Sequence, residues 1–215
     1  MDLKQAANPW TSFDIADYER HMSHENVRQL QMLSQLFKSQ YADHRPKKLL
    51  YLGVCSGNGL EHIDARVTDT VYGVDINASF LDVCRARYGA SGYNLVLKTI
   101  DLNHTFFTDD KVDLIVCNLI LEFVDIERFF GQVRLASHDD TVVSLIFQKK
   151  NAVQVVSNSG VVAIQKLKDF NQEVKEADIE ARIAEHGYQV RSKLKTTLID
   201  GKELIRIDFA KPRAA

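Results

Sequence analysis

Three glycines and one acid are the residues whose types and spacing could bind a nucleotide. Gly53, Gly57 and Gly59 follow the apolar run at 49–52, and Asp75 ends a second apolar run. Glycines accept positive φ and let backbone N–H groups approach a ligand, and a carboxylate after the next strand can accept hydrogen bonds from both ribose hydroxyls. We therefore expect a nucleoside-containing ligand at the carboxyl ends of two parallel strands.

The spacing of these glycines does not fit the dinucleotide fingerprint GxGxxG. Counted from Gly53, Cys55 occupies the second glycine position, and counted from Gly57, His62 occupies the third. What is left is GxxxGxG followed by a distal acid. A nicotinamide-dependent oxidoreductase stays an alternative class, and the mismatch counts against it.

Apolar runs that alternate with helical patterns predict an α/β fold around these residues. The expected strands are 49–52, 71–74, 94–100, 110–117 and 141–147, and the expected helices are 59–66, 78–88, 126–136 and 173–186. A hairpin of residues 188–199 and 202–210 is expected to follow, because Asp200-Gly201 is a strong turn signal. The predicted fold is a doubly wound, mostly parallel seven-stranded sheet that ends in an antiparallel hairpin.

The GxxxGxG pattern with its distal acid resembles motif I and the following acid of class I S-adenosylmethionine-dependent methyltransferases, which have a Rossmann-like fold. The resemblance spans about residues 48–210. In that family the glycine loop wraps the methionine part of the cofactor, the acid binds its ribose, and polar residues after strands three and four lie near the adenine and the sulfonium. The cofactor-binding residues that the resemblance implies are Gly53, Gly57, Gly59, Asp75, Ile76, Asp101, Leu102 and Asn118.

The resemblance implies an enzyme that moves a methyl group from S-adenosylmethionine to a small-molecule acceptor by in-line displacement, leaving S-adenosylhomocysteine. Such a reaction needs a general base only when the nucleophile is protonated, so no catalytic residue is assigned. Glu122, His21 and His24 are candidate bases. Asn118 is not followed by the Pro-Pro-aromatic of adenine- and glutamine-modifying relatives, and the Pro-Cys pair of cytosine C5 enzymes is missing.

Two positions depart from the family pattern. Tyr51 stands where many members have an acid that braces the glycine loop, and Cys55 stands where many have a second glycine. These departures leave open a noncatalytic protein that keeps the fold and serves as a cofactor-binding or partner subunit.

Two further segments are expected to surround the site. Residues 1–45 are predicted to form a helical lid on a methyltransferase domain at 46–215, with Ser23 capping a helix. In small-molecule methyltransferases a comparable segment places an aromatic ring near the sulfonium, and Tyr18 is the candidate here; the alternative is that the ring only docks the helix. Residues 155–170 are expected to shape the substrate pocket. The apolar stripe of the predicted helix consists of Val27, Leu30, Leu33, Leu36 and Phe37.

Composition limits the possible partners. A chain of 215 residues with 45% hydrophobic content can form one sizeable core. The net charge of -2, without a lysine or arginine run, argues against a nucleic-acid binder. No signal peptide or membrane-length apolar run is present, so we expect no membrane and a cytoplasmic location. Three separated cysteines and no HExxH pair predict neither disulfides nor a metal, and the oligomeric state stays open.

Overall fold

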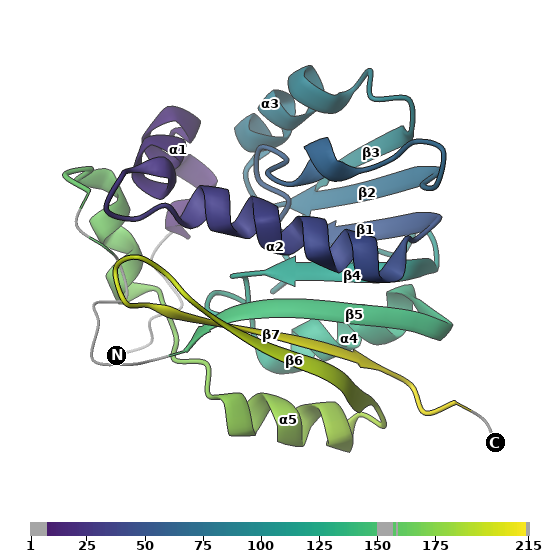
Figure 1. Ribbon diagram of the computed structural model, residues 1–215. Coiled ribbons are helices and arrows are strands. Elements are labelled where there is room, and N and C mark those ends of the chain that lie inside the picture. Colours follow the sequence, from purple (N-terminus) through teal and green to yellow (C-terminus); the bar gives the residue numbers. More distant parts are fainter. Residues whose placement is uncertain (1–7, 150–156, 158, 214–215) are drawn as a thin grey trace.

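A computed structural model describes residues 8–149, 157 and 159–213 (Figure 1). Within these residues seven strands form one sheet in the order β3-β2-β1-β4-β5-β7-β6. Pairs from β3 through β5 are parallel, and β7 runs antiparallel to both β5 and β6. The predicted doubly wound sheet with its C-terminal hairpin is confirmed. The strands are β1 (Lys48–Leu52), β2 (Thr70–Asp75), β3 (Asn94–Thr99), β4 (Val112–Asn118), β5 (Ser137–Lys149), β6 (Gln189–Thr197) and β7 (Glu203–Ala210).

Helices cover both faces of the sheet and make three layers. Side chains alternate between the faces along each strand. Leu49 packs with α2 and α3 residues on one face, whereas Leu50 packs with α4 and α5 residues on the other. None of the described helices combines the length and the apolar character needed to span a bilayer. The helices are α1 (Ile15–Ser23), α2 (Gln29–His44), α3 (Ala78–Tyr88), α4 (Ile126–Ala136) and α5 (Glu176–Glu185), with 3-10 helices η2 (Pro9–Ser12), η3 (Leu60–His62) and η4 (Ala163–Asp169).

The predicted helix over residues 59–66 is wrong, because only the short η3 forms there. The N-terminal helix α2 takes much of the sheet surface that this helix would cover. Its Phe37 ring stacks on Tyr51 of β1 with centroids 5.3 Å apart, and its Tyr41 hydroxyl accepts a 3.1 Å hydrogen bond from the Asp64 N–H. Side chains that precede β1 in sequence therefore replace a helix that would follow it.

The predicted helix capped by Ser23 is also wrong. Ser23 is the last residue of α1, and its hydroxyl donates to the Glu19 carbonyl at 2.6 Å. The chain then turns, and α2 begins at Gln29 after Arg28, whose φ of 49° is left-handed. The apolar stripe is thus interrupted, with Val27 in the connection rather than in the helix.

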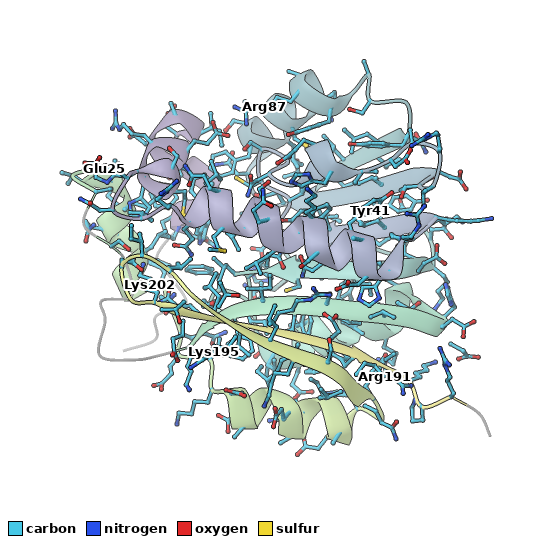
Figure 2. The ribbon with its side chains drawn as sticks, viewed as in Figure 1. Glu25, Tyr41, Arg87, Arg191, Lys195 and Lys202 are labelled. Carbon is cyan, nitrogen blue, oxygen red and sulfur yellow. The ribbon has the colours of Figure 1, made fainter. Side chains whose placement is uncertain are left out.

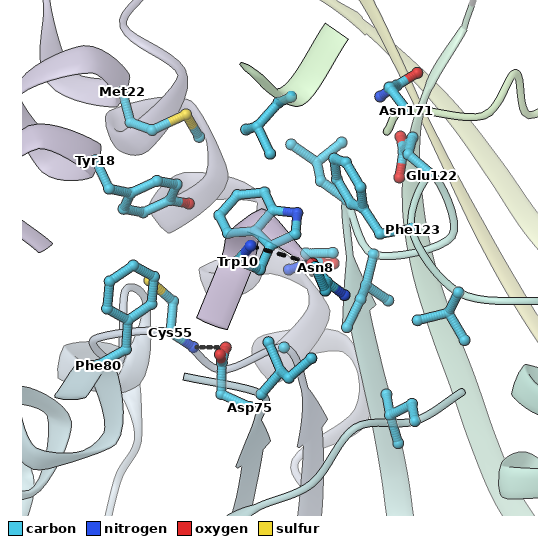
Figure 3. A pocket seen from close by; sticks show the side chains of 18 of the residues that line it. Asn8, Trp10, Tyr18, Met22, Cys55, Asp75, Phe80, Glu122, Phe123 and Asn171 are labelled. Atoms are coloured by element: carbon cyan, nitrogen blue, oxygen red, sulfur yellow. Dashed lines mark hydrogen bonds between the residues drawn. The ribbon is translucent and has the colours of Figure 1, made fainter. Parts of the chain in front are cut away.

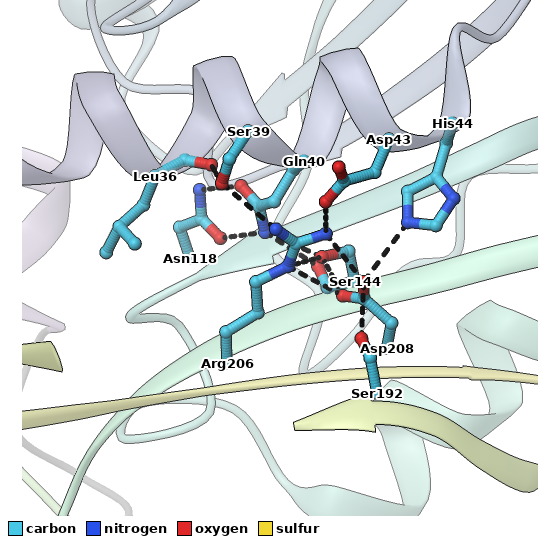
Figure 4. A network of polar contacts seen from close by, with 10 residues as sticks. All are labelled: Leu36, Ser39, Gln40, Asp43, His44, Asn118, Ser144, Ser192, Arg206 and Asp208. Atoms are coloured by element: carbon cyan, nitrogen blue, oxygen red, sulfur yellow. Dashed lines mark hydrogen bonds and ion pairs between the residues drawn. The ribbon is translucent and has the colours of Figure 1, made fainter. Parts of the chain in front are cut away.

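A buried polar network fixes α2 to the sheet (Figure 4). Gln40 of α2 and Asn118 of β4 exchange two hydrogen bonds, each 3.0 Å long. The Arg206 guanidinium of β7 binds Asp208 at 2.6 Å and Asp43 of α2 at 2.8 Å. Removing one partner from a buried ion pair leaves an uncompensated charge, which is strongly destabilising. α2 is therefore a fixed layer of the domain.

Candidate active site

A cavity lies at the carboxyl ends of the central parallel strands (Figure 3). The strand order β3-β2-β1-β4 brings together Gly53 after β1, Asp75 on β2, Asp101 after β3 and Asn118 on β4. Its empty volume is about 1180 Å³ with the open mouth included. The ends of four parallel strands therefore meet at one cavity, which is where ligands of open α/β sheets bind.

The Asp75 carboxylate is held by the loop that follows β1. One oxygen accepts a 2.9 Å hydrogen bond from the Cys55 N–H, and the other accepts a 2.9 Å hydrogen bond from the Asn77 N–H. Burial raises the pKa of Asp75 to about 6, although these hydrogen bonds act in the opposite direction. A carboxylate has about four acceptor positions, so Asp75, which lines the cavity, keeps acceptor capacity beyond these backbone hydrogen bonds. The group can accept a hydrogen bond from a ligand hydroxyl.

The three loop glycines have different surroundings. Gly53 lines the cavity, whereas Gly57 and Gly59 do not. Gly57 and Gly59 have φ values of 89° and 100°, and a Cβ on them would meet Tyr88 at 2.7 Å and Phe37 at 2.6 Å, respectively. The structure therefore places these two glycines where they shape the loop against α3 and α2.

The two departures from the expected loop pattern have visible consequences. Cys55 has a φ of 52°, in the left-handed region that glycine adopts without strain. The Tyr51 hydroxyl approaches the Asn58 carbonyl at 3.5 Å and the Asn118 amide at 3.4 Å. A phenol thus braces the loop, through long hydrogen bonds, from the position where an acid was expected.

The other predicted cofactor residues also line the cavity. Ile76 and Leu102 add apolar wall, and the Asp101 carboxylate accepts a 2.9 Å hydrogen bond from the Asn103 N–H. Asn118 contributes to the wall, but its side-chain amide is engaged by Gln40. The Asn118 side chain therefore serves mainly to hold α2.

Aromatic side chains of the N-terminal segment close the cavity (Figure 3). Trp10 contacts Tyr18 and Phe123 edge to face, with centroids 5.8 Å and 5.1 Å apart. The Trp10 carbonyl accepts a 2.9 Å hydrogen bond from the Asn77 side chain, next to Asp75. Tyr18 lines the cavity, and burial raises the pKa of its hydroxyl, so the ring is neutral. The segment before α2 is thus tied to the loop after β2.

The three candidate bases differ in environment. Glu122 is 4% exposed, lines the cavity and has a pKa raised to about 7 by burial. His21 also lines the cavity, but burial and the Lys202 charge lower its pKa to about 4, so it is a weak base. His24 is not among the lining residues. Glu122 is the best placed of the three.

Sequence reasoning missed several polar residues of the cavity, among them Lys202 and Gln148, and left one segment partly untested. Lys202, in the turn just before β7 (Figure 2), is 1% exposed, and Gln148 lies near the end of β5. Neither gave a signal, because their runs indicated only strand structure. Of the predicted pocket segment 155–170, Ile164 and Leu167 line the cavity, while residues 155, 156 and 158 lie outside the described residues.

A cavity at the carboxyl edge of a doubly wound sheet, with a glycine loop bound to an acid on the next strand, defines a Rossmann-like nucleotide-binding fold. Residues 50–136 match the methyltransferase domain family. This match and the fold together support an S-adenosylmethionine-dependent methyltransferase of class I, with S-adenosylmethionine as its cosubstrate. No curated protein sequence matches the chain significantly.

Solved structures share the fold at low sequence identity. Magnesium protoporphyrin IX methyltransferase from Synechocystis with bound S-adenosylhomocysteine is 18% identical, with a TM-score of 0.69 over 94% of this chain and 96% of that one. A methyltransferase from Clostridium acetobutylicum is 13% identical, with a TM-score of 0.65 and coverage of 93% and 100%. The DhpI complex with S-adenosylhomocysteine is 18% identical, with a TM-score of 0.63 and coverage of 96% and 100%. At these identities the likeness establishes the fold.

Proposed function

We propose that this enzyme methylates a small molecule and that S-adenosylmethionine lies along the carboxyl ends of β1 to β4. The observation that carries the cofactor assignment is the Asp75 carboxylate, which the loop backbone holds at the cavity and which keeps acceptor capacity for a ribose hydroxyl. Gly57 and Gly59 are proposed to act by shaping the loop backbone. The residues proposed to line the cofactor are Gly53, Tyr18, Asp75, Ile76, Asp101, Leu102 and Asn118.

When bound, the cofactor supplies a methyl group on a positively charged sulfur, which a nucleophile attacks in line. The protein's part is to orient this group and keep water away. Trp10, Tyr18 and Phe123 provide an apolar wall for that purpose. A cation against an aromatic face is stabilised by about 1 to 2 kcal/mol when water is excluded. The aromatic lining therefore suits the positive charge of the cofactor's sulfur.

The enclosure of the cavity favours a small acceptor. Ile164 and Leu167 of η4 close one side, and the aromatic residues before α2 close another. The division into a lid at 1–45 and a domain at 46–215 stays a prediction. Because the polar network fixes α2 to the sheet, we place any movable part of the lid before Arg28. The small-molecule acceptor, the lack of a nucleic-acid partner and the cytoplasmic location are likewise predictions.

Calorimetric titration with S-adenosylmethionine, S-adenosylhomocysteine and NADH tests the proposal. We expect micromolar binding of the first two ligands and none of NADH. Asp75→Ala should weaken S-adenosylhomocysteine binding at least tenfold, because hydrogen bonds to a charged group are lost. Asp82→Ala is the matched control, since Asp82 is an exposed acid on α3. Binding of NADH would replace the S-adenosylmethionine assignment with a nicotinamide cofactor. Absence of binding by all three ligands would favour a noncatalytic protein.

A further inference from the structure

Glu122 carries a buried carboxylate oxygen that has no hydrogen-bond partner in the described structure. Its Oε1 accepts a 2.7 Å hydrogen bond from the Gln148 N–H, and its Oε2 is the unpartnered atom. The side chain is 4% exposed and lines the cavity. Buried polar atoms are nearly always paired, and leaving one unpaired is costly. A buried, unpartnered oxygen on a residue that lines a cavity therefore points to a ligand that donates a hydrogen.

The position of this oxygen is fixed from both sides of the residue. The Glu122 carbonyl accepts a 2.9 Å hydrogen bond from the Gln172 N–H. The Gln172 side-chain amide donates to the carbonyls of Leu121 at 2.7 Å and Val124 at 2.8 Å. The loop after β4 is thus clamped by the chain that leads into α5. A group held in this way is already oriented before a substrate arrives.

The surroundings of Glu122 indicate what kind of molecule would reach it. Figure 3 shows Glu122 and Asn171 at one end of the cavity and Asp75 at the other. Phe123, Ile164 and Leu167 contribute apolar surface to the same cavity. No ion pair of Glu122 occurs among residues 8–149, 157 and 159–213, and its burial leaves it close to half protonated near neutral pH. A carboxylate whose pKa lies near the working pH can take up a proton from a bound substrate.

We propose that Glu122 is the catalytic base for an acceptor that is small, largely apolar and carries a neutral hydroxyl or amine. This inference rests on the proposed methyltransferase function and on cofactor binding near Asp75. In the reaction the acceptor's O–H or N–H bond breaks and the proton goes to Oε2 of Glu122. The nucleophile's electron pair forms the new bond to the methyl carbon, and the electron pair of the broken S–CH3 bond stays on sulfur. The negative charge of the carboxylate and the positive charge of the sulfonium disappear together.

Phenol and anisole are suitable probes, because both have an oxygen that accepts hydrogen bonds and only phenol donates one. Their dissociation constants are measured by NMR titration of the protein saturated with S-adenosylhomocysteine. At about pH 8.5, where Glu122 is ionised, we expect the wild type to bind phenol roughly tenfold more tightly than anisole, as a hydrogen bond to a charged group predicts. Glu122→Gln should bind the two within about twofold, because its Nε2 would donate to either oxygen.

Two further variants make the test decisive. Glu122→Met removes both oxygens and should abolish the preference for phenol, so the conclusion does not depend on one variant. Glu185→Gln changes an exposed acid of α5 in the same way and should keep the preference. Equal affinities in the wild type, absence of binding by both probes, or a preference that survives in Glu122→Gln and Glu122→Met would overturn the proposal. Failure to bind S-adenosylhomocysteine would instead refute the proposed function.

Discussion

Replacing Glu122 with glutamine should make the protein more stable, and the gain should depend on pH. Burial raises the pKa of Glu122 from 4.5 to about 7. Between these values the unfolded chain has lost a proton that the folded chain keeps, so unfolding releases a proton and the free energy of unfolding falls as pH rises. Above about pH 7 both states are ionised and the loss is constant. Glutamine has no proton to lose.

The size of this effect follows from the two pKa values. A difference of one unit between the folded and unfolded pKa values corresponds to about 1.4 kcal/mol, so the full effect of the buried charge on the free energy of unfolding is about 3 kcal/mol. Part of it is already present at pH 5. The free energy of unfolding of Glu122→Gln relative to the wild type should therefore rise by roughly 2 to 3 kcal/mol between pH 5 and pH 8. The nearby Cys117 thiol adds nothing in this range, because burial raises its pKa.

Urea unfolding followed by circular dichroism, at several pH values from 5 to 8, measures this difference directly. Other titrating groups cancel when the two proteins are compared at each pH. If the difference in the free energy of unfolding between the two proteins stays constant within about 0.5 kcal/mol from pH 5 to pH 8, the Glu122 carboxylate has a compensating partner and the reasoning fails. If the wild type instead becomes more stable relative to the variant as pH rises, the ionised carboxylate is stabilised by a partner.

Three other changes test separate parts of the structure. S-adenosylhomocysteine affinity, measured by calorimetry, should fall as pH drops through about 6, where Asp75 takes up a proton, and Asp75→Asn should remove this dependence. Gly59→Ala should cost roughly 2 to 4 kcal/mol in urea unfolding, because strain at positive φ adds to a clash with α2. Gly187→Ala, with φ 78° and open space, should cost only about 1 to 2 kcal/mol, and equal losses would exclude the clash. Arg206→Ala should cost about 3 to 5 kcal/mol by leaving Asp208 buried without its cation, and a loss below about 1 kcal/mol would contradict that pairing.

Local sequence signals located α3 and α4, whose first turns are capped by neighbouring side chains. The predicted bounds of α3 and α4 agree with the structure. The side chain of Asn77 accepts hydrogen bonds from the first backbone N–H groups of α3, and the Asp125 side chain does the same for α4. Such caps lie within a few residues of the helix that they start, so a short window of sequence contains them.

The features that sequence reasoning missed depend on contacts between distant residues. The helix expected after β1 is replaced by α2, which no local pattern near Gly59 could show. The glycine loop and Asp75 were recognised from spacing, but the lack of a partner for Glu122 follows from burial by segments far away in the chain. The role of Asn118 was assigned from its place after a strand, whereas its amide pairs with Gln40. Burial and pairing of polar groups are properties of the assembled domain.

The place of α2 in the chain also bears on how the protein is made. A domain generally folds as a unit, once its interacting elements have been synthesised. Here α2, which covers β1 and β4, is synthesised before any strand, so its apolar side has no sheet to pack on at first. β4 and β7, which supply Asn118 and Arg206 to the network under α2, follow much later. The network that fixes α2 is therefore complete only after β7 has been synthesised.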